Sequence, residues 1–322
     1  MSAAPTQHLR LAVLGCGYAA TLHAGALRAQ SVACSYASRD GARALAFNRR
    51  LRGHGAFASY DAALASPAID AVLVATPPAS HLELTLSALR AGKHVIVEKP
   101  AFLRAADFAG VDAAARTAGR RVFVAENYHY KPLARVLRRL LAEGAIGDVR
   151  FVHLNALKAQ PIAGWRADDE LSGGGALYEG GIHWVSFAAN LGLRVRAAHG
   201  WGAHDPRHER GLLAVFDYEG GAVGTLAYSW EIPSPLRGLR VSRVYGRKGS
   251  IAFESNGLWL AVWGRRKRLY FPGLFDLVGR RAMWRDFLHA LDTGAEPEMS
   301  FERAHRDLEL VEEIYASLGS HA

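Results

Sequence analysis

The sequence predicts an α/β protein in which a doubly wound parallel sheet is followed by an α+β domain with an open, mostly antiparallel sheet. Over the first 127 residues, short β-branched runs alternate with alanine- and leucine-rich helical stretches, as in a parallel sheet covered on both faces. From residue 149 to about 271, strand-like runs follow one another with turn residues between them, which favours antiparallel pairing. We therefore expect two domains, 1–127 and 128–322.

The expected elements follow in order along the chain. The first domain's strands are the runs "LRLAVLG", "VACSYA", "AVLVAT", "HVIVEKP" and "RVFVAEN". Between the domains, "YKPLARVLRRLLAEGAIGD" predicts a helix that closes on Gly144 and Gly147. Two helices, 279–292 and 301–318, end the chain and can pack back on the first domain.

The composition is that of a globular protein, with half of the residues hydrophobic and a fifth charged. No run approaches 18 consecutive apolar residues, and the N-terminal stretch lacks the apolar core of a signal peptide, so we expect no membrane association. The two cysteines, Cys16 and Cys34, are too few for a disulfide framework. A reducing cytoplasm is the expected location.

The net charge of +9 is dispersed along the chain. The densest basic run, "RRKR" at 265–268, lies between two strand-like segments and predicts a solvated hairpin tip. Because no aromatic platform accompanies it, we expect no nucleic-acid partner; an anionic small molecule explains the charge equally well. His204, Asp205 and His208 have no further ligand nearby, so we expect a polar turn and no metal.

A glycine loop follows the first strand in "LAVLGCGYAATLH". Gly15 permits a tight turn, Gly17 lets a pyrophosphate approach the backbone, and Ala20 is small enough for close packing of helix on sheet. Strand, loop and helix stand in the order that dinucleotide binding requires, whereas a structural glycine turn is the plainer interpretation.

The end of the second strand indicates which dinucleotide is bound. Ser38 and Arg39 stand where an acidic residue would favour NAD, and Arg43 lies one helical turn beyond. A hydroxyl and guanidinium groups suit a 2′-phosphate, which favours NADP(H) over NAD(H). In the plainer interpretation, Arg39 is a surface cation and Asp40 caps the next helix.

Two further segments end predicted parallel strands, where open α/β sheets bind ligands. In "ATPPASH" and "VEKP", the residues Thr76 and Lys99 precede proline and are conformationally restricted, and Lys99 could precede a cis bond. A lysine that closes a buried apolar strand is a candidate functional cation; a salt-bridged structural lysine is the alternative.

The stretch "SGGGALYEGGIHW" (172–184) surrounds a tyrosine, a glutamate and a histidine with five glycines. On a helix, Glu179 and His183 are i and i+4 and share a face. A carboxylate beside an imidazole fixes its tautomer and favours its protonated form, which suits proton exchange near neutrality. We interpret the glycines as space for a ligand beside this pair.

Together these motifs resemble the Gfo/Idh/MocA oxidoreductase family over essentially the whole chain. The resemblance rests on Gly15, Gly17, Ala20 and His23, on Thr76-Pro77-Pro78 with His81, on Glu98-Lys99-Pro100, on "GAIGDVR", on "GWR" at 164–166, and on 172–184.

The resemblance implies a Rossmann domain and an α+β domain whose open sheet forms a homodimer or homotetramer interface. It implies hydride exchange between a nicotinamide and a hydroxyl or carbonyl carbon of a sugar, cyclitol or related compound. Lys99 would contact the reacting oxygen and the nicotinamide ribose, and His183 would be the general acid/base, assisted by the acidic residue four positions earlier.

Further contacts are expected at both ligands. Besides Gly15, Gly17, Ala20, Ser38, Arg39, Arg43, Thr76 and Lys99, the cofactor residues would be Tyr18, Pro77, His81, Glu98 and Asn127. Besides Lys99, Glu179 and His183, the substrate residues would be Tyr128, Trp165, Arg166 and Tyr178. For Glu126, Asn127 and Tyr128, loop anchoring is the alternative; for Trp165 and Arg166, it is a packed ring with a solvated cation.

Two positions depart from the family pattern: aspartate is usual where this chain has Glu179 and where it has Ser186. The longer side chain at 179 moves the carboxylate by about 1 Å, a distance to which catalytic geometry is sensitive. Two other functions therefore stay open. One is a reductase of a non-sugar imine, enone or carbonyl compound, and the other is a nicotinamide-binding sensor without turnover.

Overall fold

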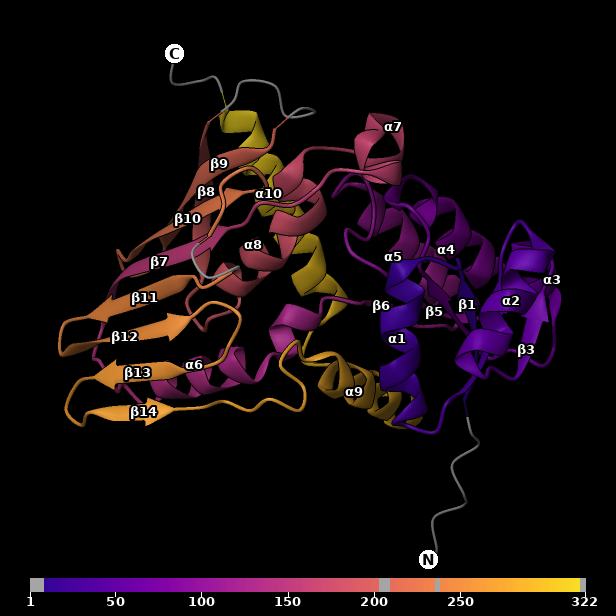
Figure 1. Ribbon diagram of the computed structural model, residues 1–322, viewed down its shortest axis with the longest axis horizontal. Coiled ribbons are helices and arrows are strands. Elements are labelled where there is room, and N and C mark those ends of the chain that lie inside the picture. Colours follow the sequence, from indigo (N-terminus) through magenta and orange to yellow (C-terminus); the bar gives the residue numbers. More distant parts are fainter. Residues whose placement is uncertain (1–8, 203–208, 235–237, 319–322) are drawn as a thin grey trace, which may run out of the picture. The chain divides into compact units, whose positions relative to one another are not determined.

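The computed structural model describes residues 9–202, 209–234 and 238–318 (Figure 1). The chain divides into two compact units. Unit 1 holds the chain up to Ala125 together with Arg280–Glu302, and unit 2 holds Glu126–Gly279 together with the chain from Arg303 onward. The sequence places the boundary after residue 127 and lets the terminal helices pack back; the structure groups the first of those helices with unit 1.

Unit 1 contains a six-stranded sheet in which all pairs are parallel, as the sequence predicts. The strand order β3-β2-β1-β4-β5-β6 reverses direction between β1 and β4, the position at which such sheets bind ligands beyond their carboxyl ends. The strands are β1 (Arg10–Leu14), β2 (Ala33–Ala37), β3 (Gly55–Phe57), β4 (Ala71–Val74), β5 (His94–Val97) and β6 (Val122–Val124).

The short edge strand β3 is not among the predicted strands. Its three residues are half-buried or exposed, so it lacks the apolar run that marks the others. The helices of unit 1 are α1 (Tyr18–Arg28), α2 (Gly41–Leu51), α3 (Tyr60–Ala65), α4 (His81–Arg90), α5 (Asp107–Ala118) and α9 (Arg280–Thr293), with a 3₁₀ turn η1 (Pro78–Ser80). Helix α9 packs against α1.

Unit 2 contains an eight-stranded sheet in the order β14-β13-β12-β11-β7-β10-β9-β8. Only β7 and β10 pair in parallel, so the sheet is mostly antiparallel, as predicted. The strands are β7 (Val149–Leu157), β8 (Val195–Gly202), β9 (Gly211–Tyr218), β10 (Val223–Ser229), β11 (Val241–Gly246), β12 (Gly249–Glu254), β13 (Leu260–Trp263) and β14 (Arg268–Tyr270). The basic run starting at residue 265 forms the tip of the β13–β14 hairpin, as expected.

Helices cover one face of this sheet. Helix α8 (Ile182–Ala189) packs on β7 and β10, and α10 (Phe301–Ser317) bonds to β8 through Glu313 and Ser317. Unit 2 also holds η2 (Asn127–Tyr130), α6 (Pro132–Ala142), η3 (Gly164–Ala167), α7 (Asp169–Ser172) and η4 (Leu177–Gly181). Among the described helices, none is long and apolar enough to cross a membrane.

Candidate active site

The glycine loop after β1 is built to receive a phosphate group. Gly15 has φ +111°, and a Cβ there would lie 2.6 Å from the carbonyl oxygen of Ala75, so only glycine fits. A Cβ on Gly17, in contrast, would meet no protein atom within 4 Å. Gly17 is the N-cap of α1, and no side chain caps the helix. The loop therefore leaves open space at a helix N-terminus, which fits a dinucleotide pyrophosphate.

The end of β2 carries two exposed cations beside this loop. Asp40 accepts hydrogen bonds from the backbone N–H groups of Ala42 (2.9 Å) and Arg43 (3.2 Å) and so caps α2. The guanidinium of Arg43 donates to the carbonyl of Cys16 in the glycine loop (2.9 Å). Arg39 is exposed at the strand end, and the hydroxyl of Ser38 accepts from the amide of Asp40. Because Asp40 is engaged as a cap, no acidic side chain among these residues serves a ribose.

The loops after β4 and β5 are held together by His81. Its Nδ1 lies 2.9 Å from the carbonyl oxygen of Pro100, and its Nε2 lies 2.9 Å from that of Thr76. Burial lowers the pKa of His81, while the two carbonyls and Glu98 act in the opposite direction. With both ring nitrogens engaged and the side chain buried, His81 holds the loops in place. The expectation that His81 contacts the cofactor stays a prediction.

Lys99 lies two residues beyond the end of β5 and precedes a cis Lys99–Pro100 peptide bond. Its backbone N–H donates to Oε2 of Glu98 (3.0 Å), and the other carboxylate oxygen of Glu98 lies 2.6 Å from Nε2 of His23. Thr76 accepts a hydrogen bond from Ser80 (2.7 Å), which fixes the turn containing Pro77. Tyr18, at the start of α1, is 74% exposed. The predicted cofactor residues of unit 1 thus lie at the carboxyl ends of β1, β2, β4 and β5.

In unit 2, a continuous helical segment carries the second group of predicted residues. It begins as a π-helical turn, η4, and continues as α8. Its first N–H groups are satisfied from distant parts of the chain: Ala176 donates to the carbonyl of Glu209, Leu177 donates to the Glu209 carboxylate, and Tyr178 donates to the Tyr315 hydroxyl. These bonds fix the segment at its N-terminus, where such groups otherwise lack partners.

His183 is paired with a carboxylate, but not with the one that its spacing suggests. Its Nδ1 lies 2.7 Å and 2.8 Å from the two carboxylate oxygens of Glu126, which is 3% exposed. Tyr128 stacks on the imidazole, with ring centroids 4.3 Å apart and planes 8° apart. Because an ionised carboxylate only accepts, Nδ1 carries the hydrogen. Within the described part of the chain, Nε2 of His183 has no hydrogen-bond partner, and the side chain is 15% exposed.

Glu179 forms an ion pair with Arg166. Its Oε1 lies 2.9 Å from Nη2 of Arg166, whose guanidinium also lies over the Trp165 ring at 4.5 Å. The prediction that Glu179 holds the His183 imidazole is therefore wrong: Glu126 supplies that hydrogen bond, and the guanidinium neutralises Glu179. The two carboxylates differ in partner because the chain enters α8 through a π turn, not through the regular helix that the i, i+4 argument assumes.

The glycines of this stretch make room for the protein itself. A Cβ on Gly180 would lie 2.3 Å from the Tyr228 hydroxyl, and one on Gly181 would lie 2.6 Å from a methyl of Leu177. A Cβ on Gly174 would press on Tyr178, which is buried. The interpretation as ligand space is corrected for Gly174, Gly180 and Gly181: the last two allow the π turn to pack closely on Tyr228 of β10, and Gly174 leaves room for Tyr178.

The hydroxyl of Ser186 on α8 bonds a second buried carboxylate, that of Asp307, which the sequence motifs do not reveal. Asp307 of α10 accepts a hydrogen bond from Nδ2 of Asn190 (3.1 Å) and bonds the hydroxyl of Ser186. Burial raises the pKa of Asp307 to about 7, with nearby Glu126 acting in the same direction. Thus position 186 carries no acid itself, but α10 places the Asp307 carboxylate beside it. Only the apolar pattern around residue 307 could have marked Asp307 as inward-facing.

Asn127 has the contacts of a loop anchor. Its side-chain amide donates to the carbonyl of Val278 (2.5 Å), and Gly279 packs on its backbone. These contacts match the loop-anchoring alternative, and a contact of Asn127 with the cofactor stays a prediction. His204, Asp205 and His208 lie outside the described residues.

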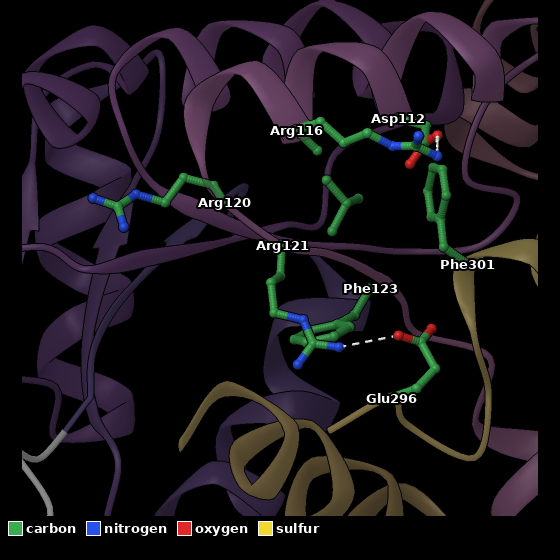
Figure 2. A pocket seen from close by; sticks show the side chains of 9 residues that line it. Asp112, Arg116, Arg120, Arg121, Phe123, Glu296 and Phe301 are labelled. Atoms are coloured by element: carbon green, nitrogen blue, oxygen red, sulfur yellow. Dashed lines mark hydrogen bonds and ion pairs between the residues drawn. The ribbon is translucent and has the colours of Figure 1, made fainter. Parts of the chain in front are cut away.

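A pocket of about 180 Å³ in unit 1 is lined by residues of α5 and β6 together with Glu296 and Phe301 (Figure 2). It opens at the amino end of β6, whereas the glycine loop follows the carboxyl end of β1. Arg121 there is bound to Glu296 (3.2 Å) and lies over Phe123, and Arg116 is paired with Asp112. Since its cations are engaged, we assign this pocket no part in the active site.

Comparison with known proteins agrees with both halves of this description. A family model described as "Oxidoreductase family, NAD-binding Rossmann fold" matches residues 9–126, and one described as "GFO/IDH/MocA C-terminal domain" matches residues 134–252. The chain is 34% identical over 278 residues to a dTDP-3,4-didehydro-2,6-dideoxy-α-D-glucose 3-reductase of Saccharopolyspora spinosa. That match covers 83% of this chain and 81% of the relative.

Two solved structures share the fold. A levoglucosan dehydrogenase in complex with NADH and levoglucosan has a TM-score of 0.86 at 20% identity, with 98% of each chain covered. A 3-ketoreductase from Actinomadura kijaniata in complex with NADP and TDP-benzene has a TM-score of 0.82 at 24% identity, with 96% of this chain and 98% of that chain covered. On the two family matches and the 34% identical relative, the chain belongs to the Gfo/Idh/MocA family of NAD(P)-dependent oxidoreductases.

Proposed function

We propose that the chain transfers a hydride between NADP(H) and a hydroxyl or carbonyl carbon of a sugar or a sugar-like compound. The observation that carries the proposal is the Glu126–His183 pair. Glu126 holds Nδ1 of His183, and Nε2 is left as the ring atom able to exchange a proton with a ligand. A histidine held in this way is a general acid/base, and its family context is an oxidoreductase.

When bound, the nicotinamide supplies or accepts the hydride. In the direction of reduction, Nε2 of His183 donates a proton to the carbonyl oxygen of the substrate, and the Glu126 carboxylate stabilises the imidazolium beforehand. In the direction of oxidation, Nε2 takes the hydroxyl proton and Glu126 stabilises the cation that forms. The ammonium of Lys99 stabilises negative charge that develops on the same oxygen.

The substrate class follows from the relatives and from the polar groups near His183. The 34% identical relative is named for reduction of a dTDP-linked keto-sugar, and a 30% identical relative of Ensifer adhaerens is named 1,5-anhydro-D-fructose reductase. Arg166 is pre-oriented by Glu179 and offers N–H groups to hydroxyl or phosphate oxygens. Trp165, Tyr128 and Tyr178 are assigned to substrate contact as well.

Preference for NADP(H) over NAD(H) rests on the end of β2. Ser38, Arg39 and Arg43 present a hydroxyl and two exposed cations, while the only acid there caps α2. We assign Arg39 to the 2′-phosphate, and the hydrogen bond from Arg43 to the carbonyl of Cys16 joins the start of α2 to the glycine loop.

Assembly as a homodimer or homotetramer is proposed from the open face of the unit 2 sheet. Phe151, Tyr245, Ser250 and Trp263 are direct partners across four strands, so they form one row on one face. Phe151 is 51% exposed and Trp263 is 50% exposed. A second copy would cover this row.

Light scattering of the unmodified protein should give the mass of an oligomer, and Phe151→Glu should shift that mass toward the mass of one chain. A single-chain mass for the unmodified protein contradicts the proposal.

The function is tested by mixing the protein with NADPH and a panel of free and dTDP-linked keto-sugars, non-sugar ketones and enones, and following the absorbance of NADPH. Turnover is expected on a keto-sugar, and Lys99→Ala and His183→Ala should each abolish it. Lys158→Ala and His153→Ala remove the same chemical groups outside the site and should leave turnover unchanged. NADPH binding without turnover on any compound would instead indicate a sensor, and turnover confined to non-sugar compounds would overturn the substrate class.

A further inference from the structure

Two buried side chains of unit 1, Trp284 and His23, and the partly exposed Glu98 form a hydrogen-bonded chain that ends at Lys99. The indole Nε1 of Trp284 lies 2.8 Å from Nδ1 of His23, and Nε2 of His23 lies 2.6 Å from Oε1 of Glu98. Trp284 and His23 are 0% and 1% exposed, and their rings meet edge to face. The second oxygen of Glu98 accepts the backbone N–H of Lys99 (3.0 Å).

The direction of each bond in this chain is fixed by chemistry. An indole N–H can only donate, so Nδ1 of His23 must hold a lone pair. The single hydrogen of the neutral imidazole is then on Nε2 and is donated to the Glu98 carboxylate. Trp284 therefore selects the one tautomer of His23 that can bond to Glu98.

We infer that Trp284 is a positioning residue for Lys99, acting through His23 and Glu98. The inference rests on the role proposed for Lys99. With His23 locked, Glu98 keeps one oxygen on the imidazole and the other on the Lys99 amide. The backbone from which the Lys99 side chain projects is thereby held from inside unit 1 by a residue 185 positions later in the chain (284 minus 99).

Trp284 also opposes a change of charge at His23. The charged and titratable groups that the structure places along this chain are Glu98, which bonds His23, and Lys99 and His81, which lie next to Glu98. Glu98 alone would favour an imidazolium. A second proton on Nδ1 of His23, however, would break the hydrogen bond from the indole, because Nδ1–H and the indole N–H are both donors. The indole N–H therefore keeps His23 in the tautomer that bonds to Glu98.

The tautomer can be measured in the unmodified protein. Two-dimensional NMR of protein labelled with ¹⁵N-histidine should show His23 with hydrogen on Nε2 only. Hydrogen on Nδ1 overturns the inference. This measurement requires neither turnover nor a variant that folds.

A variant then tests the consequence for Lys99. Trp284→Phe keeps a buried ring but removes the donor. In this variant kcat should fall about tenfold while KM for the substrate changes less than about twofold, because a reacting group is displaced and the groups that bind the substrate stay in place. NMR of the variant should show His23 no longer restricted to the tautomer with hydrogen on Nε2, because the donor that occupies Nδ1 is gone.

Two comparisons separate this effect from loss of packing. Phe287→Leu removes ring packing from the same helix α9, where Phe287 stacks on Phe123, and should leave both kcat and the tautomer of His23 unchanged. In a His23→Asn background, Trp284→Phe should lower kcat no further. If Phe287→Leu reproduces the kinetic change, or Trp284→Phe leaves kcat unaltered, Trp284 is a packing residue only. Should no substrate turn over at all, the proposed function fails, while the NMR measurement still decides the inference.

Discussion

The imidazole of His183 is held by Glu126, a residue 57 positions earlier, with Nδ1 2.7 Å and 2.8 Å from the two carboxylate oxygens. The pair joins η2, which follows the first unit's last strand, to α8, which packs on the second sheet. Glu126 also accepts the N–H of Tyr128 (2.8 Å), whose ring stacks on His183. The buried Glu126 carboxylate thus fixes the position and the tautomer of His183, the proposed acid/base, and also holds the backbone of Tyr128, whose ring stacks on it.

Replacing Glu126 with Gln should lower kcat by roughly 10- to 100-fold, within the range that general acid–base catalysis contributes. The amide keeps the shape but removes the charge that favours the imidazolium. The pH–rate profile should change as well, because the charge beside the imidazole is lost. Steady-state kinetics from about pH 5 to about pH 9 measures both effects.

The matched control is Glu179→Gln, which changes the same group four residues before the histidine. Because Glu179 is paired with Arg166, this variant should raise KM for the substrate and leave the shape of the pH profile intact. A displaced profile in Glu179→Gln with an unchanged one in Glu126→Gln would reverse the assignment.

The two glycines of the loop after β1 should respond differently to alanine. The new Cβ in Gly17→Ala meets no protein atom within 4 Å, so the free energy of unfolding without cofactor should change by less than about 0.5 kcal/mol. Binding of NADPH should weaken at least tenfold, because the methyl group occupies the space left for the pyrophosphate. In Gly15→Ala, the alanine would have to adopt φ +111°, and its Cβ would lie 2.6 Å from the carbonyl oxygen of Ala75. This variant should therefore destabilise the protein itself by at least about 1 kcal/mol. Thermal unfolding and fluorescence titration with NADPH make the comparison. Equal loss of cofactor binding and stability in both variants contradicts it.

Arg39→Ser tests the cofactor preference. Loss of charge-assisted bonds to a 2′-phosphate, worth about 1.5–3 kcal/mol, should lower kcat/KM for NADPH by roughly 10- to 100-fold. The value for NADH should change less than about threefold, because NADH carries no 2′-phosphate. Arg52→Ser removes an exposed arginine just after α2 and is the control. A higher kcat/KM with NADH than with NADPH in the unmodified protein excludes the preference.

Gly180→Ala tests whether the glycine-rich stretch is packed against protein. A methyl there would stand 2.3 Å from the Tyr228 hydroxyl, which is buried and accepts a hydrogen bond from Trp230. We expect a loss of about 1–3 kcal/mol in the free energy of unfolding, typical of overpacking. Tyr228→Phe removes the clashing atom, so the double variant should be less destabilised than the sum of the single variants, as urea unfolding will show. If Gly180→Ala is stable and only substrate binding falls, the glycine provides ligand space after all.

Much of this site could be predicted because its local rules are strong. The strand–glycine–helix order fixes Gly15 and Gly17, and the carboxyl ends of parallel strands place Thr76 and Lys99. The identity of the partner of His183 could not be predicted, because helical spacing considers only residues on the same helix. Glu126, Asp307 and Trp284 come from segments distant in sequence, and only tertiary packing brings each to its partner. The glycines misled for the same reason: their neighbour, Tyr228, lies on a strand 48 positions later (228 minus 180).

Asp307 should make stability depend on pH in a direction unusual for an aspartate. Its pKa in the folded protein is raised by burial from 3.8 to about 7, so between these values the folded protein holds a proton that the unfolded chain has released. The free energy of unfolding should therefore fall as pH rises through this window and level off above about 7. Asp307→Asn keeps an acceptor for Asn190 and cannot ionise, so its stability relative to the unmodified protein should rise by roughly 2–3 kcal/mol between pH 5 and pH 8, at 1.36 kcal/mol per pKa unit. Urea unfolding of both proteins at the two pH values measures this difference. Asp292→Asn, at an exposed position of α9, should show no such change, and an equal change in both variants would mean that Asp307 is not the group responsible.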